Sequence, residues 1–444
     1  MNRLRAIAIL LSCAMFATAC GEVAPESLAF AMSDTEETVL RIATPRIAGF
    51  EGVIANWERE HPTVEVDVVV RNIDDHHESL LNESETGNGS GSADIVAFDA
   101  SYGPEVRARE DILVDLSQFD ATPPSSRFLD ARWAEGVADS GAIVGVPLDV
   151  ESTALLVRTD LVGDRVMNQL RNASSWCDVL SAGDAFSDET NSAFLADGDD
   201  LLSAILAQTR TSFVDDTGSL RASEVGELER AFDLVMLAIG ENPAHDNPCP
   251  GAVDIERIAR NLTFGSPQWR AGLQDDDFAA AIAPWSARRR IANASPQTAG
   301  LWETIAIPVD SGAATSGSSS DGGLHLGIAA GSTQFELAYD LLLTLTDTAI
   351  QEVAFARGLG PLPAAAQLHT SSGVDGSADD FFTNDTTALI YSEAALNRPS
   401  ATATPERRVV INAMLSAVNR VEGGGQTSRE AWESMVDQVS KALS

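Results

Sequence analysis

The region that most constrains the fold is residues 38–103, where strand and helix patterns alternate. Short apolar or alternating runs predict three strands, over 38–44, 63–70 and 93–98. Apolar residues at helical spacing predict a helix over 50–60, which His61-Pro62 ends. Such alternation gives a parallel sheet with helices on both faces, and ligands bind beyond the carboxyl ends of its strands. The loops at 44–47 and 99–102 lie at those ends.

Composition sets the size and excludes some partners. A chain of 444 residues can form two or three domains. Its formal net charge of -37 repels phosphate backbones and anionic lipid surfaces, which argues against nucleic-acid binding.

The N-terminus has the pattern of a targeting signal. A basic start is followed by an apolar run over 6–17, too short to span a bilayer as a mature helix, and by Ala-Cys20-Gly. Small residues before Cys20 resemble the lipobox of bacterial lipoproteins, although alanine replaces the usual leucine at position 17. The alternative is an ordinary secretory signal cut near Ala19. We therefore predict a signal over 1–20, lipidation at Cys20, a tether over 21–37 and a mature chain outside the cytoplasm.

The four cysteines then fall into two groups. Cys13 lies in the removed segment and Cys20 carries the lipid, so Cys177 and Cys249 remain as a pair in an oxidising compartment. We predict a disulfide between them. No CxxC or Cys/His metal spacing is present, and neither a metal nor a cofactor is expected.

A turn followed by an apolar run stands near the middle of the first half. Gly145-Val-Pro enters the segment, and residues 154–157 predict a buried strand. The preceding polar cluster includes Asp149, Glu151 and Ser152. Such groups either cap the strand or pair with an arginine such as Arg158, or they face a ligand in a cleft.

Beyond Asp160 the patterns are more helical. Further strands are predicted at 278–284, 302–308 and 324–330. Helices are predicted around 228–239, 334–345, 349–357, 381–395, 406–415 and 428–443.

No enzyme motif is present, and we predict a protein without catalytic activity. GxSxG, HExxH and P-loop patterns are missing from the sequence. His76-His77 lies in a polar helix, where a solvated acidic face is favoured over a metal site. His325 is expected to be a hydrogen-bonded core histidine, or to support a ligand-binding residue, and not to act as a base.

The order of these segments resembles the family 1 extracellular solute-binding proteins, the lipoprotein receptors of ABC importers. The similarity rests on seven segments in the family order: VLRIAT, WEREHPTVEVDVV, ADIVAFDASYG, GVPLDVESTALLVRTDL, AAAIAPWSA, GGLHLGIAAGS and GLGPLPA. Residues 185–278 match no family motif. The resemblance implies an α/β fold similar to maltose-binding protein, with two lobes, each a mostly parallel sheet flanked by helices, joined by a hinge. It places lobe one at 38–148 plus 324–365 and lobe two at 149–323 plus 366–444.

The resemblance also implies ligand-binding positions: Arg46, Asp99, Ser101, Tyr102, Asp149, Glu151, Trp285, Gly323 and Gly360. Carboxylates accept hydroxyl hydrogen bonds, and aromatic faces pack against the CH face of a sugar. We therefore expect a monomeric receptor for a neutral carbohydrate, with ABC permease subunits as partners and membrane contact only through the lipid. A polyamine or other cation receptor, and a non-transport sensor lipoprotein, remain open on the same fold.

Overall fold

The computed structural model describes residues 38–46, 49–86, 93–109, 111–209, 213–215, 220–250, 255–309, 322–356, 360–370, 381–383, 386–397 and 404–443. The predictions for the signal, Cys20 and the tether lie outside these residues.

The first sheet has the strand order β2-β1-β3-β9-β4. Its strands are β1 (Thr38–Thr44), β2 (Val64–Val70), β3 (Ile95–Asp99), β4 (Val146–Pro147) and β9 (Leu324–Ile328). β1 pairs in parallel with β2 and β3, whereas β9 is antiparallel to both β3 and β4. The predicted parallel sheet is therefore correct except for β9, which returns from a distant part of the chain.

The second sheet has the order β6-β7-β5-β8. Its strands are β5 (Thr153–Arg158), β6 (Ala193–Leu195), β7 (Phe278–Pro284) and β8 (Trp302–Ile305). β6 and β7 are parallel, and β5 runs antiparallel to β7 and β8. The chain passes from the first sheet to the second between β4 and β5 and returns between β8 and β9. The lobe boundaries given above remain a prediction.

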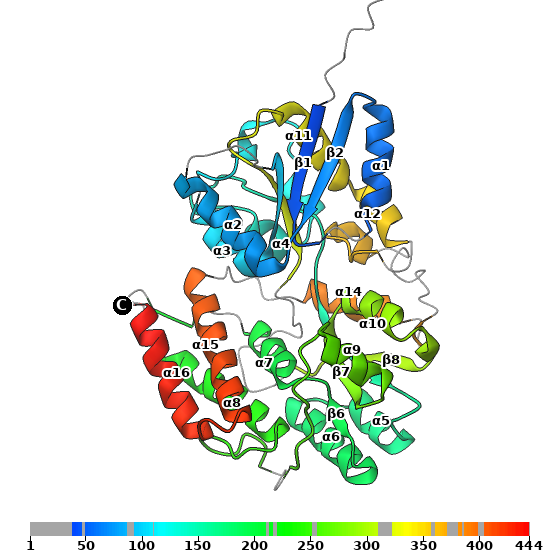
Figure 1. Cartoon of the computed structure of the whole chain (residues 1–444), viewed down its shortest axis with the longest axis vertical. Coiled ribbons are helices and arrows are strands. Elements are labelled where there is room, and N and C mark those ends of the chain that lie inside the picture. The colour runs from blue at the N-terminus through cyan, green and yellow to red at the C-terminus, as the bar shows by residue number, and fades with distance from the viewer. Residues whose placement is uncertain are drawn as a thin grey trace, which may run out of the picture. The chain divides into compact units, whose positions relative to one another are not determined.

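Helices flank both sheets (Figure 1). Around the first sheet they are α1 (Glu51–Glu60), α2 (Ile73–Thr86), α3 (Gly103–Arg107), α4 (Asp130–Glu135), α11 (Phe335–Leu345) and α12 (Thr348–Phe355). The others are α5 (Asp164–Arg171), α6 (Trp176–Thr190), α7 (Gly198–Ala207), α8 (Ala222–Ala238), α9 (Pro267–Gln274), α10 (Ala287–Ala294), α14 (Thr387–Leu396), α15 (Pro405–Glu422) and α16 (Ser428–Ala442). Short 3-10 turns include η1 (Ala100–Tyr102), η2 (Leu116–Gln118), η3 (Ser125–Arg127), η4 (Pro296–Thr298) and η5 (Ala366–His369). The predicted helix over 381–395 is wrong at its start, because Phe381 and Phe382 pack into a core before α14 begins.

The largest apolar core lies around α6, α7, α8, α15 and α16. Capping boxes fix the starts of two of these helices. Ser175 and Asp178 cap α6, and Thr427 and Glu430 cap α16. The predicted disulfide is confirmed: Cys177 in the first turn of α6 is bonded to Cys249, 72 residues later. It ties α6 to the loop that follows α8.

The histidine pair of α2 corrects a sequence prediction. His76 and His77 are 1% and 0% exposed, so they do not lie on a solvated face. His76 Nε2 contacts the carbonyl of Ala97, and the backbone N–H of Asp99 donates to His77 Nε2. Helix α2 therefore buries its histidines against β3 because they satisfy backbone groups at the end of that strand. His325 is a buried core histidine, as predicted, with Nε2 against the carbonyl of Arg132.

Candidate functional site

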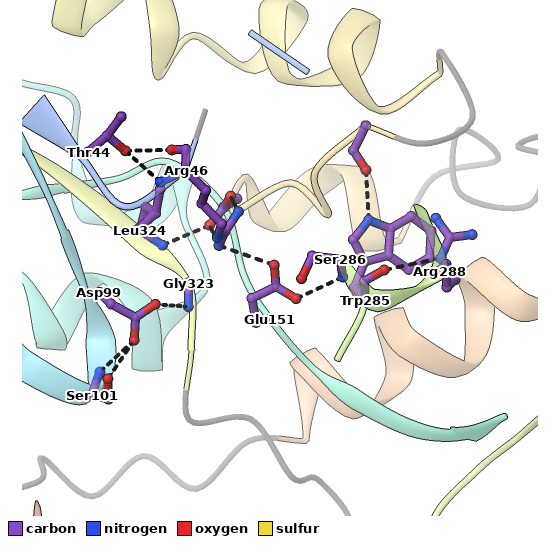
Figure 2. Close-up of polar contacts among 12 residues, drawn as sticks. Thr44, Arg46, Asp99, Ser101, Glu151, Trp285, Ser286, Arg288, Gly323 and Leu324 are labelled. Atoms are coloured by element: carbon purple, nitrogen blue, oxygen red, sulfur yellow. Dashed lines mark hydrogen bonds and ion pairs between the residues drawn. The ribbon is translucent and has the colours of Figure 1, made fainter. Parts of the chain in front are cut away.

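Three chain segments meet between the two sheets. The backbone around Asp149–Glu151 forms isolated bridges with Pro363 and with Gly322, and the N–H of Val150 donates to the carbonyl of Leu362. These segments bring most of the predicted ligand residues close together, as Figure 2 shows for Arg46, Asp99, Glu151, Trp285 and Gly323.

Arg46, which follows β1, pairs with both carboxylates of the connection between β4 and β5. Its Nη1 and Nη2 donate to the two oxygens of Asp149 at 2.6 and 2.9 Å, and Nη2 lies 3.2 Å from Glu151 Oε1. The two carboxylates of the polar cluster therefore pair with Arg46, not with Arg158, whose partners are Asp160 and Asp276. Ser152 instead donates to the carbonyl of Tyr391.

Backbone donors hold the same two carboxylates. The N–H of Leu324 donates to Asp149 Oδ1 at 2.7 Å, and that of Ser286 donates to Glu151 Oε2 at 3.0 Å. Burial alone lowers the pKa of Arg46, but Asp149 and Glu151 outweigh it and the pKa is raised. Burial, together with the charge of Asp149, raises the pKa of Glu151 against the opposing effect of Arg46. The cluster joins the end of β1, the β4–β5 connection, the start of β9 and the end of β7.

Asp99 ends β3 and caps η1. Its carboxylate accepts from the backbone and hydroxyl of Ser101 at 3.0 and 2.8 Å and from the N–H of Gly323 at 3.3 Å. Gly323 has φ +119, and a Cβ there would approach the carbonyl oxygen of Asp149 to 2.7 Å. This position requires glycine because the crossing segments approach so closely.

Trp285 lies inside a core and presents no open face in this structure. It is 2% exposed, and its Nε1 donates to the carbonyl of Gly360 at 2.7 Å. The guanidinium carbon of Arg288 lies 3.1 Å from the ring centroid, and Tyr391 meets the ring edge-on. These contacts are those of a side chain in a core.

Tyr102 is also covered. His77 stacks on its ring with centroids 3.9 Å apart and planes 7° apart, and the guanidinium carbon of Arg408 lies 4.2 Å from the ring centroid. Since a parallel imidazole fills one face, Arg408 covers the other. The hydroxyl of Tyr102 donates to Asp74, and burial, followed by this hydrogen bond, raises the pKa of Tyr102.

A pocket of about 290 Å³ lies beside Tyr102, between elements that flank the first sheet and helices α7 and α15. Its lining is Ile73, Asp74, Ala100, Ser101, Tyr102, Pro104, Arg107, Glu135, Ser203, Thr404, Arg407, Arg408, Ile411 and Asn412. We call this the α15 pocket. Of the predicted ligand residues, only Ser101 and Tyr102 line it.

The sequence reasoning missed the contribution of α15. Arg407 and Arg408 follow Pro405 in the first turns of that helix, and the pair of adjacent arginines was the available signal. Their partners lie far away in sequence: Arg407 donates to Thr209 and to the carbonyl of Leu206, and Arg408 Nε donates to Glu105 Oε1 at 2.6 Å.

The described residues contain no group of three or more histidine, cysteine or acidic side chains arranged to hold a metal ion. None of their helices combines the length and the apolar character needed to cross a bilayer.

Solved structures share this fold. A family 1 extracellular solute-binding protein superposes with a TM-score of 0.74 at 24% identity, over 92% of this chain and 100% of its own. The GacH receptor of Streptomyces glaucescens, solved unliganded and with acarbose, gives 0.72 at 17% identity, over 92% and 98%. An ABC transporter solute-binding protein of Thermotoga lettingae, bound to α-D-tagatose, gives 0.69 at 19% identity, over 92% and 100%.

No model of a protein family matches the sequence, and no curated protein does. At these identities the comparison establishes the fold. The chain has the α/β fold of the family 1 extracellular solute-binding proteins, the architecture that maltose-binding proteins share, as the sequence resemblance predicted.

Proposed function

We propose that this protein is an extracytoplasmic binding protein that captures a carbohydrate in the α15 pocket and delivers it to an ABC transporter permease without chemical change. The observation that carries the proposal is the pocket itself. Its wall combines apolar groups (Ile73, Pro104 and Ile411) with hydroxyl, amide and charged groups, which suits a ring with one CH face and directed hydroxyls. Structural neighbours bound to tagatose and to lacto-N-biose support a sugar.

The predicted ligand residues divide into two proposed roles. Ser101 and Tyr102 border the ligand. Arg46, Asp99, Asp149, Glu151, Trp285, Gly323 and Gly360 bond one another or nearby backbone groups and hold the crossing segments in place. In this proposal the lobes keep the boundaries predicted from the sequence, and the crossing segments act as the hinge between them.

The polyamine alternative is weaker than the sequence suggested. It needs carboxylates that can neutralise a cation, but Asp149 and Glu151 already pair with Arg46. A sensor without a permease would share the pocket and differ only in its partner.

Calorimetry with mono- and oligosaccharides, and with putrescine and spermidine, tests the ligand class. Asn412→Trp places a bulky ring in the pocket from an exposed position of α15, and it should weaken saccharide binding at least ~10-fold by occluding the ring site. Asn419→Trp is the matched control, since Asn419 is exposed on the same helix and does not line the pocket. Binding of a diamine alone, weakening steeply with salt, would overturn the carbohydrate assignment.

The anchor is a separate part of the proposal. If Cys20 is acylated, Cys20→Ser releases the protein from the membrane fraction or leaves it unprocessed. A Cys20→Ser protein that remains membrane-bound in mature form would show that the anchoring proposal is wrong.

A further inference from the structure

The α15 pocket contrasts with the charge of the whole chain. The sequence has 29 lysines and arginines against 66 acidic residues, yet the pocket is lined by three guanidinium groups and two carboxylates. Both carboxylates have protein partners: Asp74 accepts from the hydroxyl of Tyr102, and Glu135 pairs with Arg132. Guanidinium groups therefore outnumber carboxylates in the lining, and one of them, Arg408, pairs with Glu105 from outside it.

Among the arginines that line the pocket, Arg408 has N–H donors that are not used in bonds between the described residues. Its Nε donates to Glu105 Oε1 at 2.6 Å, and neither of its Nη groups has a hydrogen-bond partner among the described residues. Glu105 Oε2 is buried and likewise lacks a partner there, so the pair is joined through one atom on each side. The Arg408 side chain is 33% exposed. One edge of the guanidinium thus remains available to a ligand.

The same guanidinium is fixed in direction before any ligand arrives. It lies over the ring of Tyr102, which is itself fixed by His77 and Asp74. A planar fork held in this way matches the two oxygens of a carboxylate and loses little conformational entropy on binding. No sugar ring can stack on Tyr102 while His77 and Arg408 cover its two faces, so Arg408 is the group that meets the ligand there.

We propose that the saccharide bound in the α15 pocket is acidic, a uronate whose carboxylate is bound by the Nη groups of Arg408. This inference rests on the proposed function and specifies its ligand class. The apolar wall of Ile73, Pro104 and Ile411 faces the sugar ring, and Arg107 and Arg407 add favourable potential for the anion. The acidic saccharide takes the place of the neutral carbohydrate that the sequence predicted.

The first experiment compares matched ligands. Calorimetry uses di- and trisaccharides of galacturonate, glucuronate and mannuronate, each beside its carboxyl-reduced neutral counterpart with the same linkage. We expect the wild-type protein to bind one uronate series about 10- to 100-fold more tightly than its neutral counterpart, the range for hydrogen bonds to a charged group.

The second experiment separates ligand recognition from contact between α15 and α3. Arg408→Gln should abolish the preference for the acidic saccharide. Glu105→Gln removes the ion pair but keeps Arg408, so the preference should persist or increase. Arg165→Gln is the control for the same change of charge, because Arg165 lies on α5 and pairs with Glu189 away from the pocket. Melting temperatures of all variants establish that each one is folded.

The outcomes are distinct. Equal affinity for acidic and neutral saccharides, or equal loss of the preference in Arg408→Gln and Glu105→Gln, would overturn the inference and leave carbohydrate binding intact. Binding of neither kind of saccharide would overturn the proposed function together with the inference.

Discussion

Trp285 lies in a network in which every side of the indole has a partner. Its N–H is bonded to Gly360, Arg288 covers one face, and Phe355 and Tyr391 also pack against it. A ring with these contacts stabilises the region where the end of β7 meets the crossing segments.

Trp285→Ala should lower the free energy of unfolding by about 3–5 kcal/mol, because it removes a buried ring and leaves a cavity. Chemical denaturation measures the loss. Trp285→Phe keeps most of the side-chain volume and should lower the free energy of unfolding by less. Its main effect is that the carbonyl of Gly360 loses its hydrogen-bond donor. A Trp285→Ala protein as stable as wild type but unable to bind saccharide would instead restore a direct ligand role.

Asp149 carries the second residue-scale prediction. Its side chain is 2% exposed and that of Arg46 is 23% exposed, so neutralising Asp149 leaves a largely buried guanidinium with Glu151 as its remaining carboxylate. Asp149→Asn should lower the free energy of unfolding by about 3 kcal/mol. Asp437→Asn, which breaks the exposed pair with Lys441, should leave it unchanged. If Asp149→Asn and Asp437→Asn both changed the free energy of unfolding only slightly, the Arg46–Asp149 pair would contribute little to stability.

At the scale of elements, helix α7 begins with three buried or half-buried aspartates, Asp197, Asp199 and Asp200. Asp197 is 4% exposed and caps the helix through the N–H of Asp199 at 3.0 Å. Burial first, then the charges of Asp199 and Glu422, raise the pKa of Asp197 to about 7. Burial and these charges outweigh the dipole of α7, which favours an ionised carboxylate at the start of the helix. Burial also raises the pKa values of Asp199 and Asp200.

This raised pKa makes stability depend on pH. Between about pH 4 and pH 7 the folded chain holds a proton at Asp197 that the unfolded chain has released, so stability decreases as pH rises through this range. Asp197→Asn keeps the cap oxygen without the charge. It should stabilise the protein at pH 8 by at most about 4 kcal/mol and have little effect at pH 4. Asp347→Asn is the control, because Asp347 caps α12 in the same way but pairs with Arg127. An Asp197→Asn protein that is no more stable than wild type at pH 8 would contradict the raised pKa of Asp197.

The disulfide between Cys177 and Cys249 stabilises the same group of helices. Since it closes a loop of 72 residues, the Cys177→Ser/Cys249→Ser double variant should lose about 4 kcal/mol of stability by the chain-entropy model. Denaturation of both proteins measures the difference. Thiol labelling of the unreduced, unfolded wild-type chain should detect neither cysteine.

For the whole molecule, net charge is the dominant electrostatic property. A formal charge of -37 repels itself most strongly in the compact state, and salt screens that repulsion. We expect a higher melting temperature in 1 M sodium chloride than in dilute buffer. A lower melting temperature in salt would mean that the ion pairs, such as Arg46 with Asp149, outweigh the general repulsion.

Local patterns in the sequence determined much of the fold. Residues 38–98 encode β1, α1 and β2 through periods of two and 3.6 and β3 through a short apolar run, and the paired cysteines were identified by elimination. Periodicity and turn chemistry act over a few residues, so they can be interpreted without the partners of each segment.

Only the tertiary structure decided which charged and aromatic groups meet. Arg46 joins Asp149 across 103 positions, and Arg408 joins Glu105 across 303. A strand end marks where a polar side chain can lie, but its partner depends on segments brought together by folding. The family resemblance placed Arg46, Asp149 and Glu151 at one ligand site. Their pairing, the burial of Trp285 and the position of Arg408 over Tyr102 followed from long-range packing alone.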